Sequence, residues 1–283
     1  MGIFSDVLLV SDYDNTLTEP GGLPGMDGKI TKTTRIAPAN LEAIAAFVRE
    51  GGLFTIASGR TRIYYENVIG RAIVPNAPLV LANGAHIYDP VKQQDVLVRP
   101  MDENAMHLAR DVMQRFRHVA IEAQRTDAMC IVYAPKEDRS YYDHIPYHIK
   151  GDIDTFEGPW IKMHFSGAHE QIVALMEYLQ AHYPAYEYAM SVPTVCEMQV
   201  RGVTKGDASR WLARQLGRKI LVCVGDAPND VPMLEEADYA FVPENGFESV
   251  RQMGFLDAAP SRKGAVADVI RQMRAILQRK GQA

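Results

Sequence analysis

Two carboxylates separated by a single residue follow the first apolar stretch of the chain. Residues 7–10 are continuously apolar and partly β-branched, which predicts a buried strand, and Asp12 and Asp14 stand at its carboxyl end. Alternate side chains of an extended backbone point the same way, so these carboxylates would lie close together. Because like charges repel and burial of a charge is costly, such a pair normally requires a cation.

The same pair also suits a tight turn or a purely structural metal site. A calcium-binding EF-hand loop beginning at Asp12 could take its fifth ligand from Thr16, but it also needs glycine at its sixth position and glutamate at its twelfth. Leu17 and Leu23 occupy those two positions. The residues therefore exclude the EF-hand loop and leave the turn and the structural metal site open.

The composition limits the class of protein. At 283 residues the chain is long enough for two domains, and its net charge of −5 argues against nucleic acid as the main partner. No apolar run approaches the roughly 20 residues of a membrane-spanning helix, and no signal peptide is recognisable. Cys130, Cys196 and Cys223 lie far apart in apolar runs, which predicts buried free thiols and a cytoplasmic protein.

Apolar runs of strand length alternate with helical patterns, as in a parallel sheet. Helical periodicity begins at Pro38 and stops at Gly51, and another helical pattern follows Thr61. After the strand at residues 7–10, further strands are predicted for residues 53–57, 78–82, 220–224 and 239–242. This order predicts an α/β fold with a doubly wound, Rossmann-like parallel sheet.

The pattern changes after the strand at residues 78–82. An antiparallel pair of short strands is predicted on either side of residue 90, followed by two helices, each with further strands, up to about residue 200. This is an α+β segment inserted into the parallel sheet. We therefore predict a discontinuous core domain over residues 1–86 and 200–283 and an inserted domain over residues 87–199.

Polar residues also follow other predicted strands. Ser58 and Gly59 precede a helix, where a hydroxyl group and free backbone N–H groups can hold a phosphate, although an ordinary helix cap has the same pattern. Lys205 opens a helix and, taken alone, suits a solvated surface. Asp226 and Asp230 follow the strand that ends at residue 224.

The carboxyl ends of parallel strands share one edge of a sheet, so these residues can meet although they lie far apart in sequence. Oxygen ligands without histidine or cysteine favour a hard cation such as Mg²⁺. Beside that cation, a lysine and a helix-capping hydroxyl form an anion site, and the combination suits phosphoryl transfer. One carboxylate can attack phosphorus to form an aspartyl-phosphate, and a second can protonate the leaving oxygen and then activate water.

Four motifs in this chain resemble those of the haloacid dehalogenase-like hydrolases. They are Asp12-Tyr13-Asp14-Asn15-Thr16, Ser58-Gly59-Arg60, Lys205, and Gly225-Asp226-Ala227-Pro228-Asn229-Asp230. Asn15 replaces the more usual glycine, and Tyr13 is bulkier than the usual aliphatic residue. The insert resembles the C2B cap of the Cof-type (subfamily IIB) phosphatases, which Asn83-Gly84-Ala85 and Val203-Thr204-Lys205-Gly206 also match. The resemblance covers nearly the whole chain and implies a core domain of this superfamily with an inserted α+β C2B cap.

The resemblance implies a role for each matching residue. Asp12 would be the nucleophile and Asp14 the general acid/base. Mg²⁺ would be bound by Asp12, Asp226 and the backbone carbonyl of Asp14. The phosphoryl group would be held by Thr16, Ser58, Gly59 and Lys205. Asn229 and Asp230 would orient the metal shell and Lys205, and Asn83 would contact substrate or phosphate. Residues in the cap that could face the leaving group are Arg125, Lys162, His164, Glu197 and Gln199.

The expected function is a Mg²⁺-dependent phosphatase acting on small phosphorylated metabolites, sugar phosphates above all, with no nucleic acid or membrane as partner. Dehalogenation is disfavoured because Asp14 is an acid, and a transport ATPase is disfavoured because no membrane span is present. Two alternatives stay open. One is a phosphomannomutase-like phosphosugar mutase, which shares the cap type, and the other is a non-catalytic sensor of a phosphorylated ligand.

Overall fold

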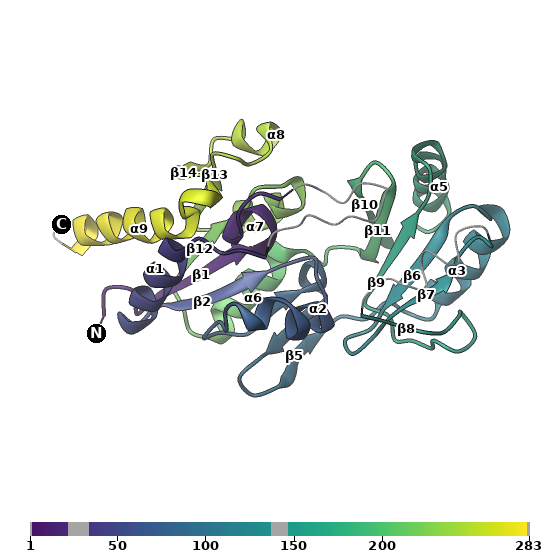
Figure 1. Cartoon of the computed structure of the whole chain (residues 1–283), viewed down its shortest axis with the longest axis horizontal. Coiled ribbons are helices and arrows are strands. Elements are labelled where there is room, and N and C mark those ends of the chain that lie inside the picture. Colours follow the sequence, from purple (N-terminus) through teal and green to yellow (C-terminus); the bar gives the residue numbers. More distant parts are fainter. Residues whose placement is uncertain (1, 22–33, 137–146, 282–283) are drawn as a thin grey trace. The chain divides into compact units, whose positions relative to one another are not determined.

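The computed structural model of the chain describes residues 2–21, 34–136 and 147–281 (Figure 1). Contacts divide the chain into two compact units, each with its own sheet. The core unit comprises Met1–Arg60, Tyr65–Val96 and Thr204–Ala283. The inserted unit comprises Thr61–Tyr64 and Leu97–Val203.

The core unit is organised around an eight-stranded sheet. In sheet order its strands are β14 (Leu256–Ala258), β13 (Tyr239–Pro243), β12 (Ile220–Val224), β1 (Val7–Asp12), β2 (Leu53–Ala57), β3 (Leu79–Leu81), β4 (His86–Asp89) and β5 (Gln94–Val98). Neighbours from β14 to β3 run parallel, and β4 runs antiparallel to β3. β1 is buried along its whole length between β12 and β2, as its apolar sequence requires (Figure 1).

The register of these strands brings their carboxyl ends to one level. Ser11 of β1 lies opposite Val224 of β12, and Asp12 lies opposite Ala57 of β2. The residues that leave β12 and β2 therefore start beside Asp12. The doubly wound arrangement expected from the sequence is present, and the edge at which α/β folds place their ligands carries the acidic motifs.

Helices pack on this sheet in two close pairs, α1 with α9 and α6 with α7. The helices of the core unit, including α2, which begins in the inserted unit, are α1 (Pro38–Arg49), α2 (Arg62–Asn67), α6 (Lys205–Gln215), α7 (Val231–Glu236), α8 (Glu248–Arg251) and α9 (Ala265–Gly281). Proline at the first position starts α1, and Gly51, with φ of +92°, follows its end. Thr204 caps α6 by accepting a hydrogen bond from the Asp207 N–H at 3.0 Å, which fixes the start of the helix at Lys205.

The hairpin β4–β5 differs from the sequence-based prediction, which assigned it to the insert. It extends the core sheet, because β4 pairs directly with β3 through Leu79 opposite Tyr88 and Leu81 opposite His86. The chain leaves the core unit near Val96 and Leu97 and returns near Val203 and Thr204. The first point lies about ten residues beyond the predicted boundary at residue 86, and the second lies about four residues beyond the predicted boundary at residue 200.

The inserted unit contains a six-stranded, largely antiparallel sheet. In sheet order its strands are β10 (Tyr186–Val192), β11 (Val195–Val200), β9 (Lys162–Ser166), β6 (Ala120–Gln124), β7 (Met129–Tyr133) and β8 (His148–Ile149). Helices α3 (Asn104–Arg115) and α5 (His169–His182) pack against the sheet through an apolar core that includes Leu108, Val112, Ile172 and Leu175.

Alternation along these strands separates an apolar face from a polar one. Ile121, Met163, Phe165 and Met198 belong to the core shared with the helices. Polar residues of the same strands alternate to the opposite face of the sheet, and they include Glu122, Gln124, Lys162, His164 and Glu197. The inserted unit is thus an α+β layer pair whose sheet has one charged face.

The three cysteines are free and buried, as the sequence predicts: Cys130, Cys196 and Cys223. Among the described residues, no helix combines the length and the hydrophobicity needed to cross a membrane.

Candidate active site

Three buried aspartates meet at the carboxyl edge of the core sheet. Asp12 ends β1, Asp226 follows β12, and Asp230 stands at the start of α7. One carboxylate oxygen from each lies within 4.8 Å of the other two, although Asp12 is separated from the other two residues by more than 200 positions. The register of β1 and β12 accounts for this meeting, because both strands end at the same level.

Lys205 supplies a positive charge to this cluster. Its Nζ lies 2.7 Å from Asp12 Oδ1 and 2.7 Å from Asp230 Oδ1, and the side chain is 1% exposed. Gly206 lets α6 approach α7 closely, since a Cβ at this position would be 2.1 Å from the Pro232 carbonyl oxygen. Burial alone would lower the pKa of Lys205, but the two carboxylates raise it well above its usual range, so the ammonium group stays charged.

The electrostatics of the cluster suit a cation. Burial, followed by repulsion from Asp230, raises the pKa of Asp12 well above its usual range and raises the pKa of Asp226 to about 7. One ammonium group therefore leaves the three carboxylates with excess negative charge. Hard oxygen ligands in a buried, negatively charged site are the donor set that a divalent cation such as Mg²⁺ prefers. The residues present fit such an ion.

Asp230 organises the cluster because both of its carboxylate oxygens are engaged by the protein. Oδ1 accepts from Lys205, and Oδ2 accepts from the backbone N–H groups of Asp226 and Ala227 at 3.0 Å each. One oxygen of Asp12 accepts a hydrogen bond from Lys205, and one oxygen of Asp226 accepts a hydrogen bond from the Thr16 hydroxyl. Within the described residues, no hydrogen bond reaches their second oxygens, which suits Asp12 and Asp226 as direct metal ligands.

The loop after β1 is held in one conformation. Asn15 adopts φ of +63°, a left-handed conformation that asparagine tolerates, so it can replace the glycine usual at this position. The Asn15 N–H donates to Thr18 Oγ1 at 3.1 Å, and the Asn15 carbonyl accepts from Asn245 Nδ2 at 2.9 Å. Asn245 also accepts from the Ser261 N–H at 2.7 Å. The loop that carries Asp14 is therefore tied to the loop after β13.

Asp14 lies on this loop, outside the buried cluster, with 25% of its side chain exposed. Arg60 Nε donates to Asp14 Oδ2 at 3.1 Å, and Arg60 Nη2 donates to Asp14 Oδ1 at 3.3 Å. Both carboxylate oxygens are thus engaged by one guanidinium group. The sequence motif contains Arg60, but no pattern in the sequence assigns it this partner.

Ser58 and Asn83 join the loops that follow β2 and β3. Ser58 Oγ accepts from the Arg60 N–H at 3.1 Å, and the Ser58 carbonyl accepts from the Asn83 N–H at 3.1 Å. Asn83 has φ of +52° and is 9% exposed. Ser58 and Gly59 follow β2 directly, and Asp12 lies opposite the last residue of that strand.

The remaining predicted residues divide into two groups. Thr16 is fully buried, and its hydroxyl donates to Asp226 Oδ1 at 2.8 Å. Asn229 is exposed, and the structure does not bring its side chain into the hydrogen-bonded cluster. Two residues that organise the site carry no predicted role. They are Asn245 and the helix cap Thr204. The sequence signal for Asn245 is its place beside a strand end, and Thr204 belongs to a stretch that matches the Cof-type phosphatases without a role of its own.

In the inserted unit, the ionisable residues predicted to contact the leaving group form ion pairs with different partners. Lys162, which is 1% exposed, lies 2.6 Å from Glu197, and His164 lies between Glu122 and Glu197 at 3.2 and 3.7 Å. Burial alone would raise the pKa of Glu122, but His164 and His148 hold it well below its usual range. Arg125 instead pairs with Asp127 and lies over the Phe156 ring, so it belongs to a different part of the inserted unit.

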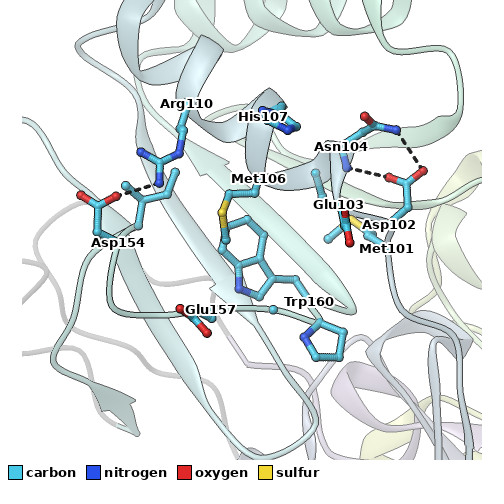
Figure 2. A pocket seen from close by; sticks show the side chains of 14 residues that line it. Met101, Asp102, Glu103, Asn104, Met106, His107, Arg110, Asp154, Glu157 and Trp160 are labelled. Carbon is cyan, nitrogen blue, oxygen red and sulfur yellow. Dashed lines mark hydrogen bonds and ion pairs between the residues drawn. The ribbon is translucent and has the colours of Figure 1, made fainter.

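A pocket of about 1020 Å³ also lies in the inserted unit, beside the start of α3. Figure 2 shows Trp160 and Met106 between two polar pairs, Arg110 with Asp154 and Asn104 with Asp102. Arg110 forms an ion pair with Asp154 at one end of this pocket, and the pocket contains none of the acidic cluster of the core unit.

The sequence profile of the haloacid dehalogenase-like hydrolases matches residues 9–270. The chain belongs to this family. It is similar to the HMP-PP phosphatase of Serratia proteamaculans, with 25% identity over 240 residues that cover 81% of this chain and 85% of the relative. The family and this relative identify the hydrolase as a phosphatase.

Solved structures support the fold of this hydrolase. TM0651 from Thermotoga maritima superposes with a TM-score of 0.74 at 22% identity, covering 94% of this chain and 96% of the other. The subclass IIB sugar phosphatase BT4131 superposes with a TM-score of 0.72 at 18% identity, covering 94% and 98%. The family match over residues 9–270 confirms the superfamily that the sequence motifs predict, and the likeness to a subclass IIB phosphatase agrees with the Cof-type resemblance.

Proposed function

We propose that this phosphatase hydrolyses small phosphorylated metabolites, sugar phosphates in particular, in a Mg²⁺-dependent reaction through an aspartyl-phosphate on Asp12. The observation that carries the proposal is the cluster of Asp12, Asp226, Asp230 and Lys205, with Asp14 on the adjoining loop. Mg²⁺ would be held by Asp12, Asp226 and the Asp14 carbonyl, and it would neutralise charge on the phosphoryl group.

The chain's own residues account for both halves of the reaction. An oxygen of Asp12 attacks phosphorus, the bond between phosphorus and the leaving-group oxygen breaks, and Asp14 gives that oxygen a proton. Asp14 then takes a proton from a water molecule that attacks the same phosphorus, which releases phosphate and restores the Asp12 carboxylate. Lys205 holds Asp12 in place and offsets charge on the phosphoryl oxygens, which Ser58, Gly59 and Thr16 also hold.

Sugar phosphates are the proposed substrate class because of the charged face of the inserted sheet, which we assign to a substrate-selecting cap. Gln124 is 2% exposed, and its Oε1 has no hydrogen-bond partner within the described residues. Together with the paired Lys162, Glu197 and His164, it offers hydrogen bonds suited to hydroxyl groups. The buried free cysteines support a cytoplasmic enzyme.

Phosphate release from a panel of esters tests this proposal. The panel contains hexose and pentose phosphates, nucleotides, HMP-PP and p-nitrophenyl phosphate, each measured with Mg²⁺ and with EDTA. We expect release with Mg²⁺ that EDTA abolishes, highest for sugar phosphates. Asp12→Asn should keep the fold, because it retains the side-chain shape, and should lose turnover. Asp257→Asn, an exposed aspartate of β14, is the matched control. Phosphate esters that bind without release would favour a sensor, and isomerised sugar phosphates a mutase.

A further inference from the structure

Arg60 donates a hydrogen bond to each carboxylate oxygen of Asp14. Its Nε and Nη2 atoms, on one side of the guanidinium group, donate to Oδ2 and Oδ1 at 3.1 and 3.3 Å. This two-pronged geometry fixes the plane of a carboxylate as well as its position, which a single point charge cannot do. A carboxylate has about four lone-pair sites, so two hydrogen bonds from one guanidinium group do not by themselves prevent it from taking a proton.

The backbones on both sides of this pair are themselves fixed. The Arg60 N–H donates to Ser58 Oγ at 3.1 Å, and the Arg60 carbonyl accepts from the Ala82 N–H at 2.9 Å. Asp14 precedes Asn15, whose left-handed turn is closed by Thr18. The guanidinium group therefore connects the loops after two neighbouring parallel strands, β1 and β2, at a set distance.

The exposure of the pair argues against a role in stability. The side chains of Arg60 and Asp14 are 29% and 25% exposed, and ion pairs this open to water contribute little to folding, about 0–1 kcal/mol. Asp12 is held by buried Lys205, whereas Asp14 lies on a partly exposed turn. The main effect of Arg60 is to limit where the Asp14 carboxyl group can point.

We infer that Arg60 is a positioning residue for the proton transfers of Asp14, and that it governs turnover of esters whose leaving group needs a proton. This inference rests on the proposed function. Misplacing a proton donor by about 1 Å can cost on the order of 100-fold in rate. A nitrophenolate ion leaves without a proton, so the first step with p-nitrophenyl phosphate is insensitive to Arg60, whereas the first step with a sugar phosphate depends on it.

Pre-steady-state kinetics of Arg60→Gln test the inference. With p-nitrophenyl phosphate, we expect a burst of nitrophenol at the wild-type rate, followed by slow turnover, because only water activation is impaired. With a sugar phosphate, we expect single-turnover cleavage to fall about 10- to 100-fold. Arg60→Lys should recover little of the wild-type rate, because a lysine ammonium group cannot bind both Asp14 oxygens in one plane as a guanidinium group does. Arg71→Gln, an exposed arginine of the core unit, should match the wild type on both esters.

A double-mutant cycle separates positioning from direct contact with substrate. If Arg60 acts through Asp14, adding Arg60→Gln to Asp14→Ala should cause no further loss with the sugar phosphate. An equal loss on both esters in the first step, or a further loss in the Asp14→Ala background, would overturn the inference while leaving the phosphatase proposal intact. A wild-type protein that released phosphate from neither ester would overturn both.

Discussion

Lys205 lies 2.7 Å from both Asp12 and Asp230, yet Asp226 shares the same buried edge of the sheet. The hydrogen bonds of the three aspartates indicate which of them could bind a metal directly. Both carboxylate oxygens of Asp230 accept hydrogen bonds from the protein. Within the described residues, Asp12 and Asp226 each have one oxygen that accepts no hydrogen bond. Asp226 is therefore the residue at which metal binding can be tested without removing the proposed nucleophile.

Asp226→Ala should reduce the rate and the response to Mg²⁺ together. The substitution removes a proposed metal ligand and also leaves the Thr16 hydroxyl without its acceptor. We expect initial rates at least about 100-fold below wild type, with little dependence on Mg²⁺ concentration. Rates measured over a titration of Mg²⁺, with Asp257→Ala as the exposed control, check this. A variant that saturates with Mg²⁺ as the wild type does would place the metal elsewhere.

Among individual residues, the sequence predicts those that end strands better than those that pair across loops. Asp12, Asp226 and Asp230 meet as expected, because parallel strands bring their carboxyl ends to one edge. The partner of Asp14 depends on how two loops turn, which no local pattern encodes. Asn229 lies in the same motif as Asp230, yet one side chain is exposed and the other fully buried.

Helices α6 and α7 hold the positive and negative parts of the site at a fixed separation. Gly206 immediately follows Lys205, and a Cβ there would be 2.1 Å from the Pro232 carbonyl oxygen. The close approach of the two helix starts places Lys205 beside Asp230. A backbone atom at this distance cannot move aside as the end of a flexible side chain can.

Gly206→Ala should therefore destabilise the protein by about 1–3 kcal/mol and also reduce activity, because α6 must shift and carry Lys205 with it. The free energy of unfolding in urea and the phosphate-release rate provide the measurements. Arg214→Ala, on the exposed side of the same helix, should change stability by no more than about 0.5 kcal/mol. Equal stability of the two variants would show that the helices do not depend on this contact.

At the level of elements, long apolar runs are predictable and short edge elements are not. β1, β2 and β12 are evident from their composition. The hairpin β4–β5 belongs to the core sheet and not, as the sequence predicts, to the insert, because a local pattern identifies a hairpin without identifying the sheet it joins. β14 and α8 have only three and four residues, too few to show a period, and neither is predicted from the sequence.

Across the whole molecule, the family profile spans residues 9–270, and the solved relatives cover 94% of the chain with a TM-score above 0.7. Both units therefore belong to one known architecture. Within it, the core unit concentrates buried negative charge at the edge of its sheet. A ligand that binds only the folded state and neutralises this charge should stabilise the protein.

Mg²⁺ should accordingly raise the midpoint of thermal unfolding. At a concentration about 100 times the dissociation constant, the expected gain in the free energy of unfolding is about 2.7 kcal/mol. Calorimetry with Mg²⁺ and with EDTA measures it. Asp226→Ala should show little gain, and Asp257→Ala should behave as the wild type. A similar gain in all three proteins would mean that Mg²⁺ acts outside the acidic cluster.

The central claim is that Asp12 carries the phosphoryl group during turnover, and trapping that species tests it most directly. The enzyme is mixed with Mg²⁺ and p-nitrophenyl phosphate, quenched in acid within one turnover, reduced with borohydride and digested for mass spectrometry. Reduction converts a phosphorylated aspartate to homoserine. We predict homoserine at position 12, and none in the Asp12→Asn variant. Phosphate release without modification at position 12, or modification at Asp14 instead, would contradict the account.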